Sequence, residues 1–208
     1  MRLRKIGLTG GIAAGKSTVA NRWSRLSGTA VIDTDDLAHQ TLTPGTPTYA
    51  AIVKTFGRHI LNADQTISRR ALGEIVFADE QKRLVLNRIV HPAVRQMWDE
   101  ALAGLARDGQ TEVAVAMIPL LFEVGAEHEF DCVVTVGCSE QTQLARLAAK
   151  GLGDAQARAR IQSQWPLQKK IDRADYVIWN DGSREVLDQQ ADIIWATIKE
   201  SHHAPTKN

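Results

Sequence analysis

The sequence predicts an α/β fold in which helices wrap a parallel sheet. Short runs rich in valine and isoleucine alternate with longer segments of helical periodicity, which is typical of this class. The short runs are almost wholly apolar, as strands buried on both faces must be. The 208 residues are enough to bury one sizeable core, and no stretch approaches membrane-spanning length.

Charge and cysteine content narrow the classes of function. Lys and Arg number 25 against 24 Asp and Glu, so no overall field draws the chain toward nucleic acid or a membrane. Cys132 and Cys138 fit neither a disulfide framework nor a zinc site. We expect a cytoplasmic protein with no nucleic-acid, membrane or obligate protein partner. We interpret His202 and His203 as part of a solvated tail rather than a metal site.

The elements are expected in a regular order along the chain. Five strands are predicted at residues 5–9, 30–32, 112–118, 132–136 and 176–179. Apolar residues at helical spacing predict one helix through Val94–Leu105 and another through Leu187–Ile198. Pro92 is expected to break or kink the helical region at His91.

The stretch from Asp33 to Glu112 is too long for one crossover connection. It predicts several helices inserted after the second strand, where we expect substrate specificity to lie. Residues 1–32 and 112–200 would then form a nucleotide-binding core, and residues 33–111 a helical acceptor domain.

A second excursion, at about 146–175, is rich in basic residues. It contains seven basic residues against three acidic ones, and Gly151 and Gly153 are a possible hinge. Basic helices are usually solvated surfaces, but a mobile cationic segment also suits a lid that neutralises phosphate charge and excludes water. We favour the helical lid. The cations are Arg146, Lys150, Arg158, Arg160, Lys169, Lys170 and Arg173.

A phosphate-binding loop follows the first strand. Gly10-x-x-x-x-Gly15-Lys16-Ser17 lies between a predicted strand and a predicted helix, the context that distinguishes this motif from a plain glycine-rich turn. Such a loop turns backbone N–H groups and a helix N-terminus toward phosphate. Lys16 would reach the β- and γ-phosphates and Ser17 would bind Mg²⁺. The candidate ATP-binding residues here are Gly11, Ile12, Ala13, Ala14, Gly15, Lys16, Ser17 and Thr18.

This loop indicates the three-layer fold of P-loop NTPases, with a five-stranded parallel sheet. A kinase of this kind also needs a group that accepts the proton of the attacking hydroxyl. Asp33 is our candidate, because it ends a predicted strand, and the carboxyl ends of strands line the ligand crevice. If that strand lies beside the first, Asp33 faces the loop. The competing role is a helix cap, which we favour for Asp35.

Several motifs together resemble the dephospho-coenzyme A kinase family, from Ile6 to about Ser183. The opening GLTGGIAAGKSTVA is similar to that of the family, and VIDTDDLAH (31–39) resembles its Ile-Asp-Ala-Asp segment. The remaining motifs follow in the family's order: SRRALGEIVF (68–77), LNRIVHP (86–92), IPLLFE (118–123) and ADYVIWNDGS (174–183).

The resemblance implies that ATP donates its γ-phosphate to the ribose 3′-hydroxyl of dephospho-coenzyme A, with Asp33 as general base and Lys16 as phosphate anchor. Arg146 would belong to the lid, and Asn180 and Gly182 to the loop near the adenine. We assign acceptor binding to Asp35, Arg69, His91 and Lys150.

The sequence departs from the family at three places. Ala13 and Ala14 stand where Gly-Ser is frequent, which suits alanine only if neither position needs a positive φ. Lys150 replaces a lid arginine and so loses a planar, bidentate grip on phosphate. Met117 stands where a carboxylate is often found.

Two other functions remain open from the residues alone. The phosphate loop and Asp33 would serve equally a kinase of another small alcohol, such as a nucleoside or a sugar. A nucleotide-dependent switch would also use the loop, although no Asn-Lys-x-Asp segment for reading guanine occurs in the sequence.

Overall fold

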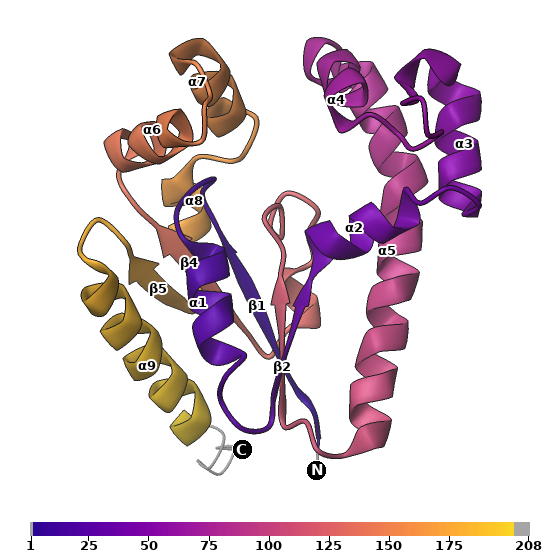
Figure 1. Ribbon diagram of the computed structural model, residues 1–208. Coiled ribbons are helices and arrows are strands. Elements are labelled where there is room, and N and C mark those ends of the chain that lie inside the picture. The colour runs from indigo at the N-terminus through magenta and orange to yellow at the C-terminus, as the bar shows by residue number, and fades with distance from the viewer. Residues whose placement is uncertain (1, 202–208) are drawn as a thin grey trace. The chain divides into compact units, whose positions relative to one another are not determined.

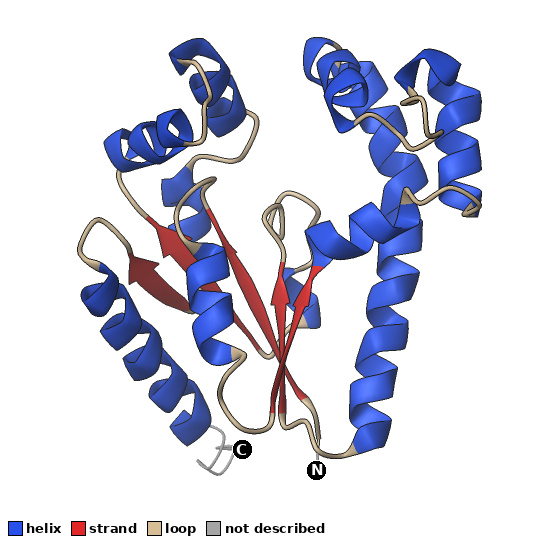
Figure 2. Cartoon of the chain, in the orientation of Figure 1, coloured by secondary structure: helices blue, strands red, loops and turns tan. Residues whose placement is uncertain are grey.

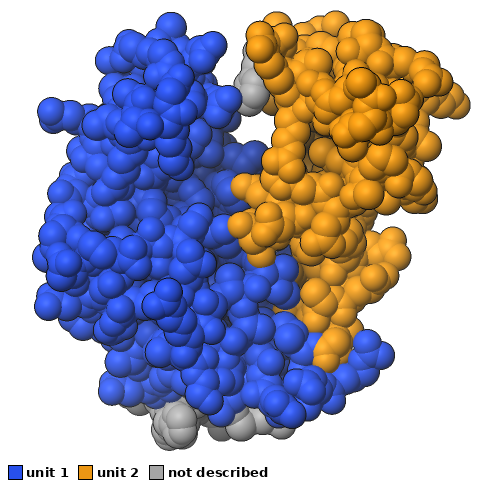
Figure 3. Space-filling view, viewed as in Figure 1, with its two compact units in different colours: residues 1–32, 105–208 blue, residues 33–104 orange. Residues whose placement is uncertain are grey.

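The computed structural model describes residues 2–201 and divides into two compact units, each with its own core. Unit 1 comprises residues 1–32 and 105–208, and unit 2 comprises residues 33–104 (Figure 3). The first division falls just before Asp33, the last residue of the second strand, where the helical insertion was expected to begin. The second falls inside a helix, seven residues before the expected boundary at 111. His202 and His203 lie outside the described residues.

Unit 1 is built on a five-stranded sheet in the order β2-β3-β1-β4-β5. All five strands run in the same direction (Figure 2), so the predicted parallel α/β fold is confirmed. The strands are β1 (Arg4–Gly10), β2 (Thr29–Asp33), β3 (Val113–Met117), β4 (Cys132–Gly137) and β5 (Tyr176–Trp179).

The condition under which Asp33 was expected to face the loop, that the second strand lies directly beside the first, is not met, because β3 lies between them. Burial explains the order. All five residues of β3 are buried, whereas all five residues of β2 are only half-buried. A fully buried strand needs a neighbour on both sides, so β3 takes the inner position and β2 the edge.

Two helices cover one face of this sheet. Helix α1 (Lys16–Trp23) and helix α9 (Arg184–Ser201) pack side by side (Figure 1). Their contact includes Trp23 and Trp195, whose ring centroids are 5.4 Å apart. The indole of Trp23 also donates a hydrogen bond to the carbonyl of Ala191. This packing holds α1, and with it the loop that precedes α1, against the sheet.

Three short helices and a 3-10 turn complete unit 1. Helix α6 (Glu140–Ala149) follows β4, and α7 (Asp154–Gln162) and α8 (Leu167–Ile171) lead to β5. The 3-10 turn η2 (Glu127–Glu129) precedes β4. Among the described residues, no helix has both the length and the apolar character that crossing a bilayer requires.

Unit 2 is helical, as the insertion predicted. It contains α2 (Thr34–Thr41), α3 (Pro47–Phe56), the 3-10 turn η1 (Arg58–Ile60), α4 (Arg69–Ala78) and most of α5 (Glu80–Asp108). Helix α3 begins in the usual way, with a Thr46 side-chain cap and proline at the first helical position. The core of this unit is formed by Ile52, Phe56, Ile60, Ile67, Leu72 and Val76.

Of the break or kink predicted at His91, the break is wrong, because helix α5 passes through Pro92 without ending. Proline inside a helix costs about 3 kcal/mol. Packing on both sides of the proline opposes this loss. Ile89 and Val90 contact the core of unit 2, and Trp98 is buried.

Candidate active site

The loop between β1 and α1 is shaped by two glycines with positive φ. Gly10 has φ 141°, and a Cβ there would lie 1.9 Å from the carbonyl oxygen of Val136. Gly15 has φ 109°, and a Cβ there would lie 2.3 Å from Nδ2 of Asn180. Gly15 is also the N-cap of α1, and no side chain caps this helix. No side-chain cap therefore competes with an anion for the N-terminus of α1.

Ala13 takes a left-handed backbone conformation, with φ 56°. We expected alanine to suit this loop only if neither position needs a positive φ. Ala13 does not meet this condition, whereas Ala14 does. The left-handed conformation costs an alanine about 1–2 kcal/mol. The surrounding contacts hold the loop in this shape against that cost.

Side chains from distant parts of unit 1 form hydrogen bonds with the loop. The guanidinium of Arg146 donates to the carbonyls of Ala13 (3.2 Å) and Asn180 (3.0 Å). The Asn180 amide donates to the carbonyl of Ala14 at 2.7 Å. The ammonium of Lys16 lies on the loop itself, 2.8 Å from the carbonyl of Gly11. Arg146 and Asn180, which were predicted to bind ATP and lie far from the loop in sequence, thus contact it directly.

A cavity of about 510 Å³ opens beside the loop, which is the size of a small-molecule site. Four cationic side chains line it, from Lys16, Arg146, Lys150 and Arg184, so the cavity suits a highly anionic ligand. The full lining is Ala13, Gly15, Lys16, Ser17, Thr18, Arg146, Ala149, Lys150, Asn180, Gly182, Arg184 and Leu187. The other predicted loop residues, Gly11, Ile12 and Ala14, belong to the loop but do not line the cavity.

The placement of two cations differs from the sequence analysis. Lys150, which we assigned to acceptor binding, is the C-cap of α6 and lines this cavity together with Lys16. Arg184 was missed. It opens α9 and forms an ion pair with Asp188 at 3.0 Å. An arginine is disfavoured by the dipole at a helix N-terminus, and this mismatch just after the NDGS segment was a usable signal.

The other acceptor candidates lie in unit 2, on three different helices. Asp33 is the N-cap of α2, and its Oδ1 accepts a hydrogen bond from the N–H of Asp35 at 2.9 Å. The cap is therefore Asp33, and the expectation that Asp35 takes this role is wrong. Asp35 lies in the first turn, because the strand ends one peptide before the helix and leaves Asp33 in the extended conformation that an N-cap needs.

Arg69 and His91 are the remaining acceptor candidates. Arg69 is the first residue of α4, directly after the Ser68 cap. His91 lies in the middle of α5, and desolvation lowers the pKa of its imidazole below the ordinary value. The neutral ring is therefore the dominant form at neutral pH.

Much of the charge in the 146–175 excursion is paired within the protein. Lys170 is fully buried against Glu123, and Arg158 pairs with Asp154 and Glu140. Arg173 pairs with Glu127, and Lys169 lies 3.5 Å from the ring centre of Trp165. Of the seven cations, Arg146 and Lys150 line the cavity.

The two cysteines are buried on or next to β4. Burial raises the pKa of Cys132 to about 11, and the pKa of Cys138 is also raised. Both are small buried hydrophobic side chains. Within residues 2–201, no cluster of three or more His, Cys, Asp or Glu side chains is placed to hold a metal ion.

A glycine-rich loop between the central strand and its helix, beside a cation-lined cavity, identifies the chain as a P-loop nucleotide-binding protein. Comparisons with known proteins support this class and narrow it. A family model described as dephospho-CoA kinase matches residues 4–185. The dephospho-CoA kinase of Geobacter sulfurreducens is 45% identical over 192 residues, which cover 92% of this chain and 96% of that protein.

Solved structures agree with the sequence comparison. A crystal structure of a Thermus thermophilus protein aligns with a TM-score of 0.79 and 31% identity, over 95% of this chain and 99% of that one. Dephospho-CoA kinase from Campylobacter jejuni aligns with a TM-score of 0.61 and 26% identity, over 94% and 97%.

The chain belongs to the dephospho-CoA kinase family. It is a phosphotransferase that uses ATP to phosphorylate dephospho-CoA, the final step of coenzyme A biosynthesis. Family membership favours this acceptor over the nucleoside, the sugar and the nucleotide switch that the residues alone left open.

Proposed function

We propose that the triphosphate of ATP occupies the cavity beside the loop and that Asp33 activates the acceptor hydroxyl. The cavity carries this proposal, because it brings four cations and an uncapped helix N-terminus to one place. In the reaction, a bond forms between the 3′-oxygen of dephospho-CoA and the γ-phosphorus, and the bond to the β–γ bridging oxygen breaks. The hydroxyl proton goes to Asp33, and ADP leaves.

Lys16 and Ser17 serve the phosphates in this proposal. The Lys16 ammonium now donates to the carbonyls of Gly10 and Gly11, and β- and γ-phosphate oxygens would replace these acceptors. Ser17, the second residue of α1, is exposed and lines the cavity. One hydroxyl plus phosphate oxygens and water is a donor set that Mg²⁺ accepts. The ion would neutralise charge on the transferred group.

The remaining cavity residues would bind the rest of the nucleotide. We assign Asn180 and Gly182, in the loop after β5, to the region of the adenine, and Arg146 to the phosphates. Lys150 supplies a charge to the same cavity. We therefore place Lys150 with the nucleotide phosphates rather than with the acceptor.

Asp33 suits a general base for two reasons. It ends β2, and the carboxyl ends of parallel strands lie at the same edge of a sheet as the phosphate loop. The hydrogen bond from the Asp35 N–H fixes one carboxylate oxygen. Within residues 2–201 this is the only hydrogen bond recorded for the Asp33 side chain, so the second oxygen can take the proton.

We assign acceptor binding to unit 2, through Asp35, Arg69 and His91, and the role of lid to residues 146–175. The near-equal numbers of acidic and basic residues and the buried thiols fit a cytoplasmic enzyme that acts on small molecules.

Replacing Asp33 by Asn tests the base directly. Asparagine caps helices about as well as aspartate, so Asp33→Asn keeps the acceptor for the Asp35 N–H and removes only the basic carboxylate. We expect kcat to fall by about 100-fold or more, with the KM for ATP little changed.

Asp36→Asn is the matched control, because it removes the same charge from the first turn of the same helix, at an exposed position. Its steady-state rate should stay close to wild type. A near-normal rate for Asp33→Asn would remove Asp33 from the role of base.

A further inference from the structure

Two glutamines hold the backbone of Ile12 from opposite ends. Gln164 Oε1 accepts the N–H of Ile12 at 3.1 Å, and Gln143 Nε2 donates to the Ile12 carbonyl at 2.8 Å. A backbone N–H can only donate and a carbonyl can only accept, so these partners fix the orientation of both side-chain amides. Gln143 comes from α6 and is 5% exposed, and Gln164 comes from the linker between α7 and α8.

The contact with the Ile12 carbonyl is one of three successive contacts between side chains and loop carbonyls. The carbonyls of Ile12, Ala13 and Ala14 accept hydrogen bonds from Gln143, Arg146 and Asn180 respectively. Because a trans peptide is planar, holding a C=O in one direction points the N–H of the next residue the opposite way. The N–H groups of Ala13 and Gly15 are thereby turned away from these side chains.

The loop leaves little freedom around these contacts. The N–H of Ala14 is used within the loop, by the carbonyl of Gly11 at 3.2 Å. A Cβ on Gly11 would lie 2.6 Å from Gln143 Nε2. Gln143 therefore occupies the space that a side chain at position 11 would take.

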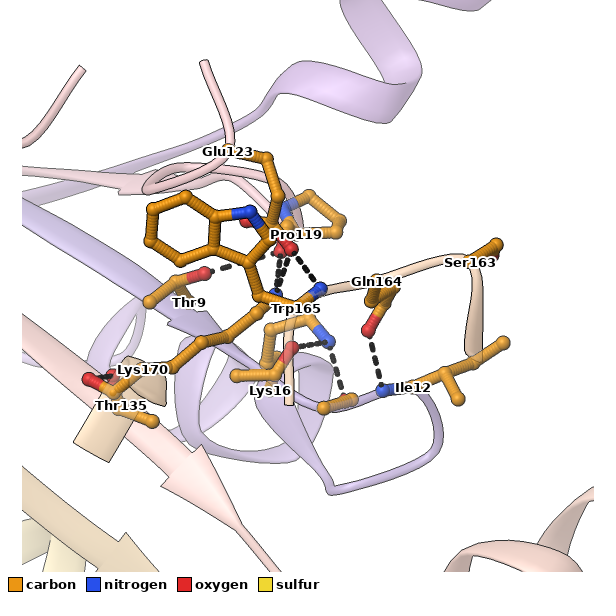
Figure 4. Close-up of polar contacts among 12 residues, drawn as sticks. Thr9, Ile12, Lys16, Pro119, Glu123, Thr135, Ser163, Gln164, Trp165 and Lys170 are labelled. Carbon is orange, nitrogen blue, oxygen red and sulfur yellow. Dashed lines mark hydrogen bonds and ion pairs between the residues drawn. The ribbon is translucent and has the colours of Figure 1, made fainter. Parts of the chain in front are cut away.

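Gln164 is itself fixed to the strand that carries the loop. The next residue, Trp165, donates its N–H to Glu123 Oε1 at 2.9 Å, and Lys170 Nζ binds the same oxygen at 2.8 Å (Figure 4). Lys170 also donates to the carbonyl of Pro119, which accepts the hydroxyl of Thr9 in β1. Both Lys170 and Thr9 are fully buried.

We propose that Gln143 and Gln164 are positioning residues for phosphoryl transfer. They hold the Ile12 peptide so that neighbouring N–H groups stay aligned with the phosphates of ATP, next to the strained backbone of Ala13. Preorganised donors of this kind act without reorganisation during the reaction. This inference rests on the proposed binding of ATP at the loop. Loss of either contact should lower kcat/KM for ATP and leave the KM for dephospho-CoA unchanged.

Substitutions at Gln164 separate hydrogen bonding from packing. Gln164→Glu keeps an oxygen that accepts the Ile12 N–H, whereas Gln164→Met keeps the length of the side chain and removes the acceptor. We expect kcat/KM for ATP to fall about tenfold in Gln164→Met, the scale of one lost hydrogen bond. Gln164→Glu should remain within about threefold of wild type.

Gln143→Glu is matched in charge to Gln164→Glu but has the opposite consequence. It removes the donor and sets a carboxylate oxygen against the carbonyl of Ile12, so kcat/KM for ATP should fall at least about tenfold below that of Gln164→Glu. Thermal melting without ligand checks that each variant folds. If Gln143→Glu does not fold, the two Gln164 variants decide alone.

Equal kcat/KM values for Gln164→Met and Gln164→Glu would overturn the inference, as would a rise in the KM for dephospho-CoA that matches the loss for ATP. Lys16→Ala separates this failure from failure of the proposed function. If Lys16→Ala weakens ATP binding while the Gln164 variants are alike, only the positioning role is lost. If Lys16→Ala binds ATP normally, the proposed ATP site itself is wrong.

Discussion

Ala13 adopts a backbone conformation that glycine takes without strain. Its φ of 56° is left-handed, and the neighbouring Ala14 is fully buried without a positive φ. Ala13→Gly should therefore raise the free energy of unfolding by up to about 1 kcal/mol, because relief of strain exceeds the extra freedom of glycine in the unfolded chain. Urea unfolding measures this change.

Ala14→Gly is the matched control, since it makes the same chemical change one residue away. It should destabilise the protein, because it deletes a buried methyl group and adds backbone freedom without relieving strain. Equal effects of the two substitutions would show that the Ala13 backbone is not strained. The sequence identified alanine here as a departure from the family, but the sign of φ at Ala13 depends on contacts with Gln143, Gln164 and Arg146.

Helix α8 is held by a buried ion pair rather than by its own propensity. It has five residues, and Lys170 within it is fully buried against Glu123. Removing one partner of a buried pair leaves an uncompensated charge and costs about 3–5 kcal/mol. Lys170→Met and Glu123→Gln should each destabilise unit 1 strongly.

The double variant Lys170→Met/Glu123→Gln leaves no unpaired charge, so its loss should be much smaller than the sum of the two single losses. A double-mutant cycle followed by Trp fluorescence in urea measures the difference. Losses that add within about 0.5 kcal/mol would mean that the two charges do not stabilise each other.

The contacts of edge strand β5 are another feature that the residues of the strand alone did not predict. The side-chain amide of Gln190 accepts the N–H of Trp179 and donates to its carbonyl, at 2.9 and 2.8 Å. It therefore takes the place of a further strand and blocks pairing at this edge. The strand itself was predicted from its apolar run, but a contact between residues eleven positions apart was not.

At the scale of the whole molecule, local patterns predicted the elements and failed on their order. The five strands follow from apolar runs rich in valine and isoleucine, and the loop follows from the spacing of Gly10, Gly15 and Lys16 between a strand and a helix. The place of β3 between β1 and β2 depends on which strand buries more surface, and the continuity of α5 through Pro92 depends on packing around Ile89 and Trp98. Arg184 belongs to no motif, and only the cavity shows that it lies beside the loop.

Because each unit has its own core, ATP should slow hydrogen exchange in one unit more than in the other. Unit 1 contains the phosphate loop and a core around Ile6, Leu8 and Val134, whereas unit 2 has a separate core around Ile52 and Ile60. ATP at about 100 times its dissociation constant should stabilise the unit that binds it by about 2.7 kcal/mol. Hydrogen exchange should therefore slow in β1, β4 and α1, with little change in α3 and α4.

Lys16→Ala provides the control, because it should abolish the slowing in unit 1 without altering exchange in the absence of ATP. Helix α5 continues across the boundary at residues 104 and 105, so its last turn should follow unit 1 and its earlier turns unit 2. Equal slowing of α3 and β1 by ATP would mean that the units open together. Segments that unfold together form one cooperative unit. ATP bound at the loop would then stabilise the insertion as well, with α5 as the connecting helix.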